Sequence, residues 1–342
     1  MSDEILQLAQ RRAINLKVGG SVETPILLPS FSSKAIQGEQ VQNLIIYMKS
    51  VITDHLLISA YDLFYREIKK KITFPSLIFL DSGGYEASED VDLSDMGRGW
   101  PNPRKWTREM HSEVLKKWDH VTPTILVSFD SPNARTSIEN QVVRATRLFR
   151  QYPMANSELL LKPTKRSTKR EKKKLEIDQV LRRKHLLAGF DIIGVTEKEL
   201  GRSTLERMTN VARLRLALNS IGLDTPIHIF GSLDTVSTPL YFLAGADIFD
   251  GLTWLRYAFD DGNTTYKNNY GAKNLGIAFE DFKVNGKVWN DNYYYLNRLK
   301  EDMAGYLSNR DFNSFRANAD FYRTSLNLLA GRLKQELKPN GG

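Results

Sequence analysis

Short apolar runs alternate with longer amphipathic stretches along most of this chain. Eight of the runs have the length of strands that are buried on both faces. They cover residues 24–30, 55–62, 77–84, 124–130, 158–164, 190–196, 226–232 and 247–252. The stretches between them, such as 106–118, 140–152 and 203–221, carry apolar residues at helical spacing. This order of strands and helices predicts an α/β fold, a (β/α)₈ TIM barrel.

Two segments exceed a minimal barrel. Residues 86–105 follow the third predicted strand and are rich in Gly, Pro, Asp and Ser, which predicts a long loop over the barrel mouth. Beyond residue 271 the apolar positions indicate extra C-terminal helices, up to about residue 338. No interdomain linker is evident, so we expect a single domain over 1–342, with the barrel at about 20–260 and a helical extension at about 271–338.

Three aspartates stand where apolar runs end. Asp81, Asp130 and Asp250 follow or close the predicted strands at 77–84, 124–130 and 247–252. An acid at the end of a buried strand is costly unless it faces a polar cavity. In a TIM barrel the active site lies at the C-terminal ends of the strands. The three acids therefore predict one cleft built from distant parts of the chain.

Composition excludes several classes of site. The 342 residues are 41% hydrophobic, enough for a large core, and they include no cysteine. Disulfides, thiolate zinc sites, iron–sulfur clusters and a cysteine nucleophile are thereby excluded. The five histidines show no HExxH-type spacing, so neither a metal centre nor another cofactor is expected. Without a signal peptide or an apolar run of transmembrane length, the chain is expected to be cytoplasmic and not bound to membranes.

The formal net charge of +8 favours an anionic partner. Residues 162–174 hold eight basic residues against one acid, among them Lys165, Arg166, Lys169 and Arg170. Such a run is either a solvated loop or a surface that contacts a phosphate backbone. Charge alone does not decide between the two.

The segment Asp81-Ser82-Gly83-Gly84-Tyr85 is the most specific motif. Two glycines after a strand permit a tight turn and a close approach of backbone to a ligand, and the aromatic residue after them could cover a planar ring. The alternative is an ordinary βα turn with a capping aspartate.

The other candidates also leave alternatives open. Asp250 could act as a base, a metal ligand or a nucleophile, or form a structural ion pair with Arg256. Asp130 could accept hydrogen bonds from the N–H edge of a purine or pair with a basic neighbour. Glu197 and Glu199 are expected to be solvated acids at a helix start. His228 lies between two isoleucines and is expected in the barrel wall.

Taken in order, these segments resemble the tRNA-guanine transglycosylase superfamily, whose members are (β/α)₈ barrels that exchange a guanine in nucleic acid for a 7-deazaguanine. The similarity covers residues 24–256. It depends mainly on the motif at 81–85 and on the closing block, which joins 229–231 to 245–250 and Arg256.

The resemblance implies a catalytic pair. Asp250 would be the nucleophile that attacks C1′ of the target nucleotide, and Asp81 would donate and accept the proton at the base. Arg256 would hold a phosphate near the flipped nucleotide. A carboxylate that traps an oxocarbenium-like sugar and a second carboxyl that protonates the leaving group form a coherent chemical set.

The resemblance also implies a base pocket. Asp130 would read N1 and the exocyclic amine of the purine, while Tyr85 and Phe230 would sandwich its ring. Ser82 would contribute to the same pocket. The backbone of the strand that contains Gly194 would contact the base.

The chain departs from the family in four places. Residues 287–298 lack the three cysteines and the histidine that hold a structural zinc in the tRNA enzymes. The glutamine of the family's fifth strand has no counterpart in Leu160-Leu161-Lys162-Pro163-Thr164, and Glu86 replaces the glutamine after the Gly-Gly-aromatic motif. The recognition loop has become residues 195–201. These changes affect the base and the polymer, and they spare the catalytic pair.

The sequence therefore predicts a transglycosylase that inserts a 7-deazaguanine, such as 7-cyano-7-deazaguanine, into nucleic acid. DNA is preferred to tRNA, because the zinc-bearing segment is missing and no appended RNA-binding domain is seen. The alternatives are a tRNA enzyme with an altered scaffold, an N-glycosidase that releases a deazapurine, and a catalytically silent nucleic-acid-binding subunit. Partner proteins and a homo-oligomer both stay open.

Overall fold

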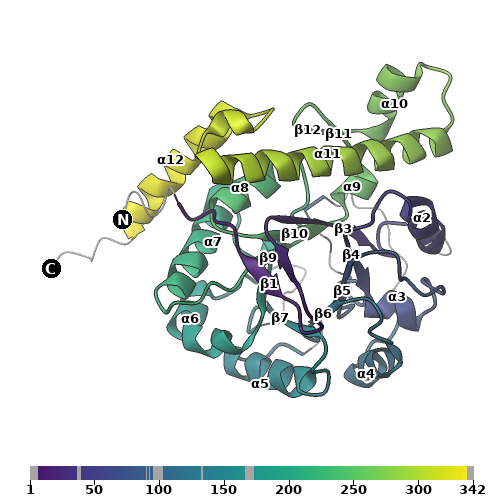
Figure 1. The fold of residues 1–342 in the computed structure, drawn as a ribbon. Coiled ribbons are helices and arrows are strands. Elements are labelled where there is room, and N and C mark those ends of the chain that lie inside the picture. Colours follow the sequence, from purple (N-terminus) through teal and green to yellow (C-terminus); the bar gives the residue numbers. More distant parts are fainter. Residues whose placement is uncertain are drawn as a thin grey trace.

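The computed structural model describes residues 7–36, 40–89, 91, 93–94, 103–131, 134–165 and 173–336. Eight parallel strands close into a barrel in the order β10-β3-β4-β5-β6-β7-β8-β9, with helices between them around the outside (Figure 1). The strands are β3 (Ile26–Phe31), β4 (His55–Ser59), β5 (Leu77–Asp81), β6 (Thr124–Val127), β7 (Asn156–Leu161), β8 (Ile192–Thr196), β9 (Ile227–Phe230) and β10 (Ile248–Gly251). The predicted (β/α)₈ barrel is confirmed, and every predicted strand overlaps one of these eight.

The barrel strands form because their side chains are apolar on both faces. An inner cluster that includes Ile26, Phe79, Ile125 and Ile248 fills the barrel. A larger cluster packs the outer faces against the helices. Because all strands are parallel, their C-terminal ends meet at one mouth, and the polar residues at these ends converge there.

The helices begin at the caps that the sequence provides. Thr107, Ser137 and Ser203 each accept a hydrogen bond from a backbone N–H three residues on. The helices around the barrel are α2 (Gln40–Met48), α3 (Ala60–Phe64), α4 (Arg108–Lys117), α5 (Ile138–Phe149), α6 (Ile177–Arg182), α7 (Thr204–Asn219), α8 (Ser237–Leu243) and α9 (Thr253–Arg256). Short 3₁₀ turns occupy Lys184–Gly189, Glu197–Glu199 and Phe312–Ser314.

Two hairpins were not expected from the sequence, because strands of three residues are too short to show a period. In the first, β1 (Ala13–Asn15) pairs with β2 (Ser21–Glu23), and Ile14 joins the inner cluster of the barrel. The amide of Asn156 at the start of β7 donates to the carbonyl of Asn15. The first hairpin thus covers the N-terminal end of the barrel (Figure 1). In the second, β11 (Ala258–Asp260) pairs with β12 (Asn263–Thr265).

Three helices follow the barrel, namely α10 (Lys267–Leu275), α11 (Asp281–Asn309) and α12 (Ala319–Glu336), and they confirm the expected C-terminal helices. The long helix α11 runs along one side of the barrel (Figure 1). Its buried Asn292 donates to the carbonyls of Trp254 and Tyr257, and this ties α11 to the chain just after β10. The expected loop at 86–105 falls largely outside the described residues. Within the described part of the chain, no helix is both long and apolar enough to span a membrane.

Candidate active site

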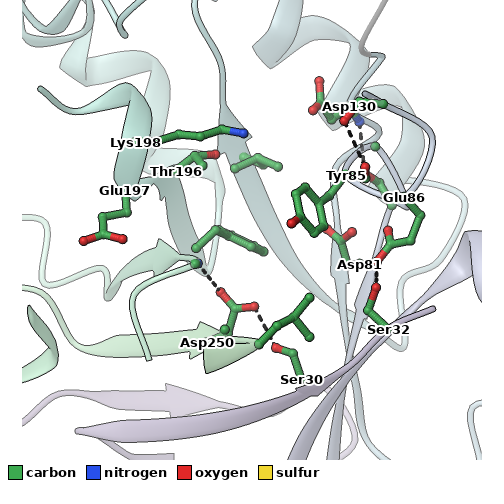
Figure 2. Close-up of a pocket in the computed structure, with 18 of the residues that line it drawn as sticks. Ser30, Ser32, Asp81, Tyr85, Glu86, Asp130, Thr196, Glu197, Lys198 and Asp250 are labelled. Carbon is green, nitrogen blue, oxygen red and sulfur yellow. Dashed lines mark hydrogen bonds between the residues drawn. The ribbon is translucent and has the colours of Figure 1, made fainter. Parts of the chain in front are cut away.

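Asp81, Asp130 and Asp250 line one cavity at the C-terminal mouth of the barrel, as predicted. They come from the ends of β5, β6 and β10 and point toward a common space (Figure 2). The apolar wall of this cavity includes Tyr85 and Phe230. A cavity with apolar walls and a few convergent polar groups is the usual form of a small-molecule or base site. We call it the reaction pocket.

Asp250 is held in place by donors on both of its oxygens. The Ser30 hydroxyl on β3 donates to Oδ2 at 2.8 Å, and the Gly231 backbone N–H after β9 donates to Oδ1 at 3.0 Å (Figure 2). Arg256 instead donates to the hydroxyls of Ser94 and Tyr85. The alternative of a structural Asp250–Arg256 ion pair is therefore not what the structure shows.

A buried polar pair lies behind Asp250. His228 on β9 is fully buried; its Nε2 lies 3.3 Å from Oδ1 of Asp250, and its Nδ1 lies 2.7 Å from Oε1 of Glu158 on β7. Its ring stacks on Phe230 with centroids 4.0 Å apart. Burial acts to lower the pKa of His228, but the carboxylates of Glu158 and Asp250 outweigh it and raise that pKa to about 9. Burial also raises the pKa of Glu158, and the imidazole opposes that rise.

This pair is the part of the site that sequence reasoning missed. His228 lies in the barrel, as expected, but its contact with Asp250 was not foreseen, and Glu158 was given no role. The available signal was the presence of two ionisable residues within otherwise apolar strands, since such groups are rarely buried without a partner.

Asp81 lies in an environment that favours its protonated form. Its side chain is almost fully buried, and Oδ2 accepts a hydrogen bond of 2.9 Å from the Gly83 N–H. Burial raises the pKa of Asp81 to about 8, assisted by the negative charges of Glu86 and, to a smaller extent, Asp250, while the Gly83 hydrogen bond opposes the rise. Asp81 is therefore largely a neutral acid at pH 7.

Glu86 forms the centre of a small carboxyl cluster. Its two oxygens accept hydrogen bonds from the hydroxyls of Ser32, at 2.5 Å, and Ser59, at 3.0 Å. Burial, together with the charge of Glu86, raises the pKa of the neighbouring Asp62 well above its usual range. Burial is thus the largest cause of the raised pKa of both aspartates, and the nearby charge of Glu86 adds to it.

Gly83 and Gly84 of the 81–85 motif each lack room for a side chain, for different structural reasons. Gly83 has a φ of +83°, and a Cβ there would lie 2.6 Å from the Cβ of Tyr61. At Gly84 an added Cβ would lie 2.8 Å from Oδ2 of Asp130. The motif is therefore more than a turn, because Gly84 leaves room for the side chain of Asp130.

Of the two alternatives left open for Asp130, the structure shows the one with a basic neighbour. It lines the reaction pocket, and it forms an ion pair with the neighbouring Arg135. Lys162 lies 3.8 Å from its other oxygen and 2.8 Å from Glu199. The backbone N–H of Asp130 donates to the Ser82 hydroxyl, so Ser82 anchors the strand end that carries this acid.

Lys34, which was not predicted as a site residue, and Gly194, the remaining predicted base contact, each lie against one ring of the aromatic wall. The Lys34 ammonium lies 4.1 Å from the centroid of the Tyr85 ring, a cation–π distance. Gly194 on β8 lies beneath Phe230, where an added Cβ would come within 2.7 Å of the Phe230 ring and 2.8 Å of Glu158. Gly194 therefore provides space for the aromatic wall and for the buried pair.

The expectation that Glu197 and Glu199 are solvated was wrong. Both are buried, at 5% exposure each. Glu197 accepts a hydrogen bond of 2.7 Å from the Tyr241 hydroxyl, and Glu199 pairs with Lys162. Short acidic turns are usually solvated, but here Lys162, directly after β7, forms a buried ion pair with Glu199.

The basic run at 162–174 can be placed only in part. Lys165 is exposed at its start, whereas Arg166, Lys169 and Arg170 lie outside the described residues. Among the described residues, no group of three or more His, Asp or Glu side chains is arranged to hold a metal ion. Residues 287–298 lie inside the continuous helix α11 and do not fit a zinc site.

No family model matches this chain, and no curated protein matches it in sequence. The geometry of the site therefore carries the functional argument.

Proposed function

We propose that this protein is a base-exchange transglycosylase that replaces a guanine in nucleic acid with a 7-deazaguanine. The proposal combines the resemblance of its motifs to the tRNA-guanine transglycosylase superfamily with the arrangement of the reaction pocket. The observation that carries it is that Asp81 and Asp250 share one pocket in opposite environments. One is kept neutral by burial near other carboxyls, and the other accepts hydrogen bonds at both oxygens.

These environments suit the two halves of the reaction. Asp250 would attack C1′ of the sugar as the bond from C1′ to the base nitrogen breaks, and the neutral Asp81 would give its proton to the leaving base. The product is an ester between Asp250 and the sugar. The incoming base would then lose a proton to Asp81 and attack C1′, which releases Asp250 and restores the original configuration.

The other residues of the pocket would bind and orient the base. An extruded purine needs an aromatic wall and groups that read its edge. Tyr85 and Phe230 would provide the wall, and Asp130, which lines the same pocket, would accept the N–H groups of the base. The ion pair between Asp130 and Arg135 would fix the direction of this carboxylate.

DNA is the preferred polymer in this proposal. The segment that would carry zinc in the tRNA enzymes is a helix without cysteine here, Glu86 replaces one glutamine of the family pattern, and the glutamine of the fifth strand has no counterpart. These differences affect recognition and leave the acid pair in place. A 7-deazaguanine such as 7-cyano-7-deazaguanine is the proposed incoming base.

A second candidate function is an N-glycosidase that releases a deazapurine. Water would then attack the Asp250 ester in place of the second base, and the same two carboxyls would serve. The pocket favours exchange, because its wall combines two aromatic rings with an acid suited to holding a second base.

The test is incorporation of labelled 7-cyano-7-deazaguanine or guanine into duplex DNA and into tRNA at matched salt. The proposal predicts label in polymer, with more in DNA, and nucleoside mass spectrometry of DNA and tRNA from cells with and without the protein should show the same modified nucleoside. Asp320→Asn, an exposed acid on α12, is the control and should incorporate as the native protein does.

Three results would count against this proposal. Label in neither polymer would reject transglycosylation. Release of deazapurine from a polymer that already contains it, without incorporation of the labelled base, would establish the hydrolase instead. Incorporation into tRNA alone would keep the chemistry and overturn the choice of DNA.

A further inference from the structure

A second cavity adjoins the reaction pocket, between α4 and α5 and beyond the ends of β6 and β7. The two cavities share a wall made of Asp130, Arg135, Leu160 and Lys162. A ligand group in the second cavity would therefore lie on the other side of the residues that would read the base. None of the chemistry assigned above uses this cavity.

Three arginines stand around its opening without a carboxylate partner. Arg108 comes from α4, and Arg144 and Arg147 come from one face of α5. Among the described residues, none of these guanidiniums forms a hydrogen bond or an ion pair with an acid of the cavity. Burial and the like charges of Arg144 and Arg147 lower the pKa of Arg108, and the charge of Glu109 only partly opposes them. The cavity is therefore strongly positive.

The floor of the cavity carries an unused polar atom. His111 is 1% exposed, lines the cavity, and its Nε2 has no hydrogen-bond partner within the described part of the chain. Burial and the charge of Arg108 lower the pKa of His111 to about 4, so the ring is neutral at pH 7. The Phe129 ring lies against the His111 ring, with centroids 5.3 Å apart. The Arg108 guanidinium lies 5.6 Å from the centroid of the Phe129 ring. A buried nitrogen without a partner indicates a missing ligand group.

We propose that this cavity binds a phosphate group of the nucleic-acid strand, next to the nucleotide whose base enters the reaction pocket. The inference rests on the proposed function for the identity of the strand. Arginine forks match phosphate oxygens in pairs, and a neutral imidazole nitrogen can add one hydrogen bond without adding charge. Two phosphates flank every extruded nucleotide, so a phosphate site one wall away from the base site suits such a substrate.

The same chemistry would also bind the phosphate of a free nucleotide, and the experiment separates the two sources. Binding of a labelled single-stranded oligonucleotide to the full chain is measured by fluorescence anisotropy over a range of salt concentrations. Binding of guanosine monophosphate is measured by calorimetry. No second base is present, so the result does not depend on base exchange.

The test variant is Arg108→Gln/Arg147→Gln, which removes one cation from each helix. The matched control is Lys116→Gln/Arg150→Gln, which removes the same charge from exposed positions at the ends of the same two helices, outside the cavity. We expect the test variant to bind the oligonucleotide roughly tenfold more weakly and to lose about one unit of salt slope. The control should retain the native slope.

Each outcome decides the inference. A selective loss in the test variant supports the phosphate site, and it does so even if base exchange is absent and the proposed function fails. A selective loss of guanosine monophosphate binding with unchanged oligonucleotide binding assigns the site to a free nucleotide. Equal loss in both variants, no loss in either, or no binding of either probe to the native protein overturns the inference.

Discussion

Two aspartates three residues apart, one directly before β10 and one within it, have opposite surroundings. Asp247, directly before β10 at the closed end of the barrel, is 1% exposed and accepts hydrogen bonds from Arg12 at 2.8 Å and Arg215 at 2.6 Å. The Ile227 N–H donates to it as well. Asp250, at the open end, has two neutral donors and lies on the wall of the reaction pocket.

The comparison shows that partners, and not burial alone, separate a structural acid from a reactive one. Asp247 joins two buried guanidiniums, so its charge is fully used in holding β10 to α7 and to the N-terminal segment. Asp250 lines the reaction pocket and has a buried imidazole behind it. In TIM barrels, residues at the N-terminal ends of the strands generally serve stability, and residues at the C-terminal ends serve chemistry.

The largest expected effect is on activity at the open end. Asp250→Asn removes the nucleophile while preserving size, so base exchange should fall at least about a thousandfold. The chain should stay folded, because the amide oxygen of asparagine can still accept from the Gly231 N–H, and its NH2 group can donate to the Ser30 hydroxyl oxygen. Rate measurements on duplex DNA, with thermal unfolding as a check, test this. Activity within tenfold of the native rate would exclude Asp250 as nucleophile.

The next largest effect is on stability at the closed end. Asp247→Asn leaves Arg12 and Arg215 buried without a full counter-charge, which should lower the free energy of unfolding by about 3–5 kcal/mol in urea titrations. The matched control is Asp224→Asn, since exposed Asp224 pairs with the same Arg12 at 2.8 Å. That control should lower the free energy of unfolding by less than about 1 kcal/mol. Equal losses in the two variants would contradict the distinction between the ends.

A smaller effect is expected from the positioning residue behind the nucleophile. His228→Phe keeps the ring against Phe230 and removes the nitrogen near Asp250, so kcat should fall roughly tenfold while KM for the incoming base stays unchanged. His228→Gln, which keeps a donor, should recover part of the loss. If His228 acted only in packing, the phenylalanine variant would be the more active of the two.

The same residue predicts a pH dependence of stability. Its folded pKa of about 9 lies above the ordinary histidine pKa of 6.5, so its stabilisation is present below pH 6.5 and is lost as the pH rises through 9. The free energy of unfolding should fall over this window by up to about 3 kcal/mol, and His228→Phe should flatten the curve. An unchanged curve in the variant would show that His228 is not protonated in the folded protein.

The smallest effect concerns the charge near the acid. Asp81 must be protonated to serve the leaving base, so activity should fall as the pH rises through about 8. Glu86→Gln removes the neighbouring charge that helps to raise this pKa and should move the alkaline limb of kcat/KM down by about one pH unit. The control is Glu89→Gln, an exposed acid three residues on. An alkaline limb of kcat/KM that stays at the same pH, or that shifts to higher pH, would contradict the role of Glu86.

Much of this architecture could be predicted from sequence, because its signals are local. The eight apolar runs, the helical spacing between them and the acids at the strand ends indicate a parallel barrel with a polar mouth. Parallel strands then bring their C-terminal ends together, so the convergence of Asp81, Asp130 and Asp250 follows from the fold class. The two hairpins escaped prediction because three residues carry no period.

What only the tertiary structure decided is the partner of each acid. Strands buried on both faces are apolar throughout, so the alternation that separates inward from outward residues is missing, and nothing local shows that His228 and Glu158 face each other inside the barrel. The protonation of Asp81 likewise depends on Glu86, brought close by the turn that Gly83 and Gly84 permit. Chain order determined which groups reach the mouth, whereas packing across strands determined their charge, because electrostatic energies depend on distance and burial in three dimensions.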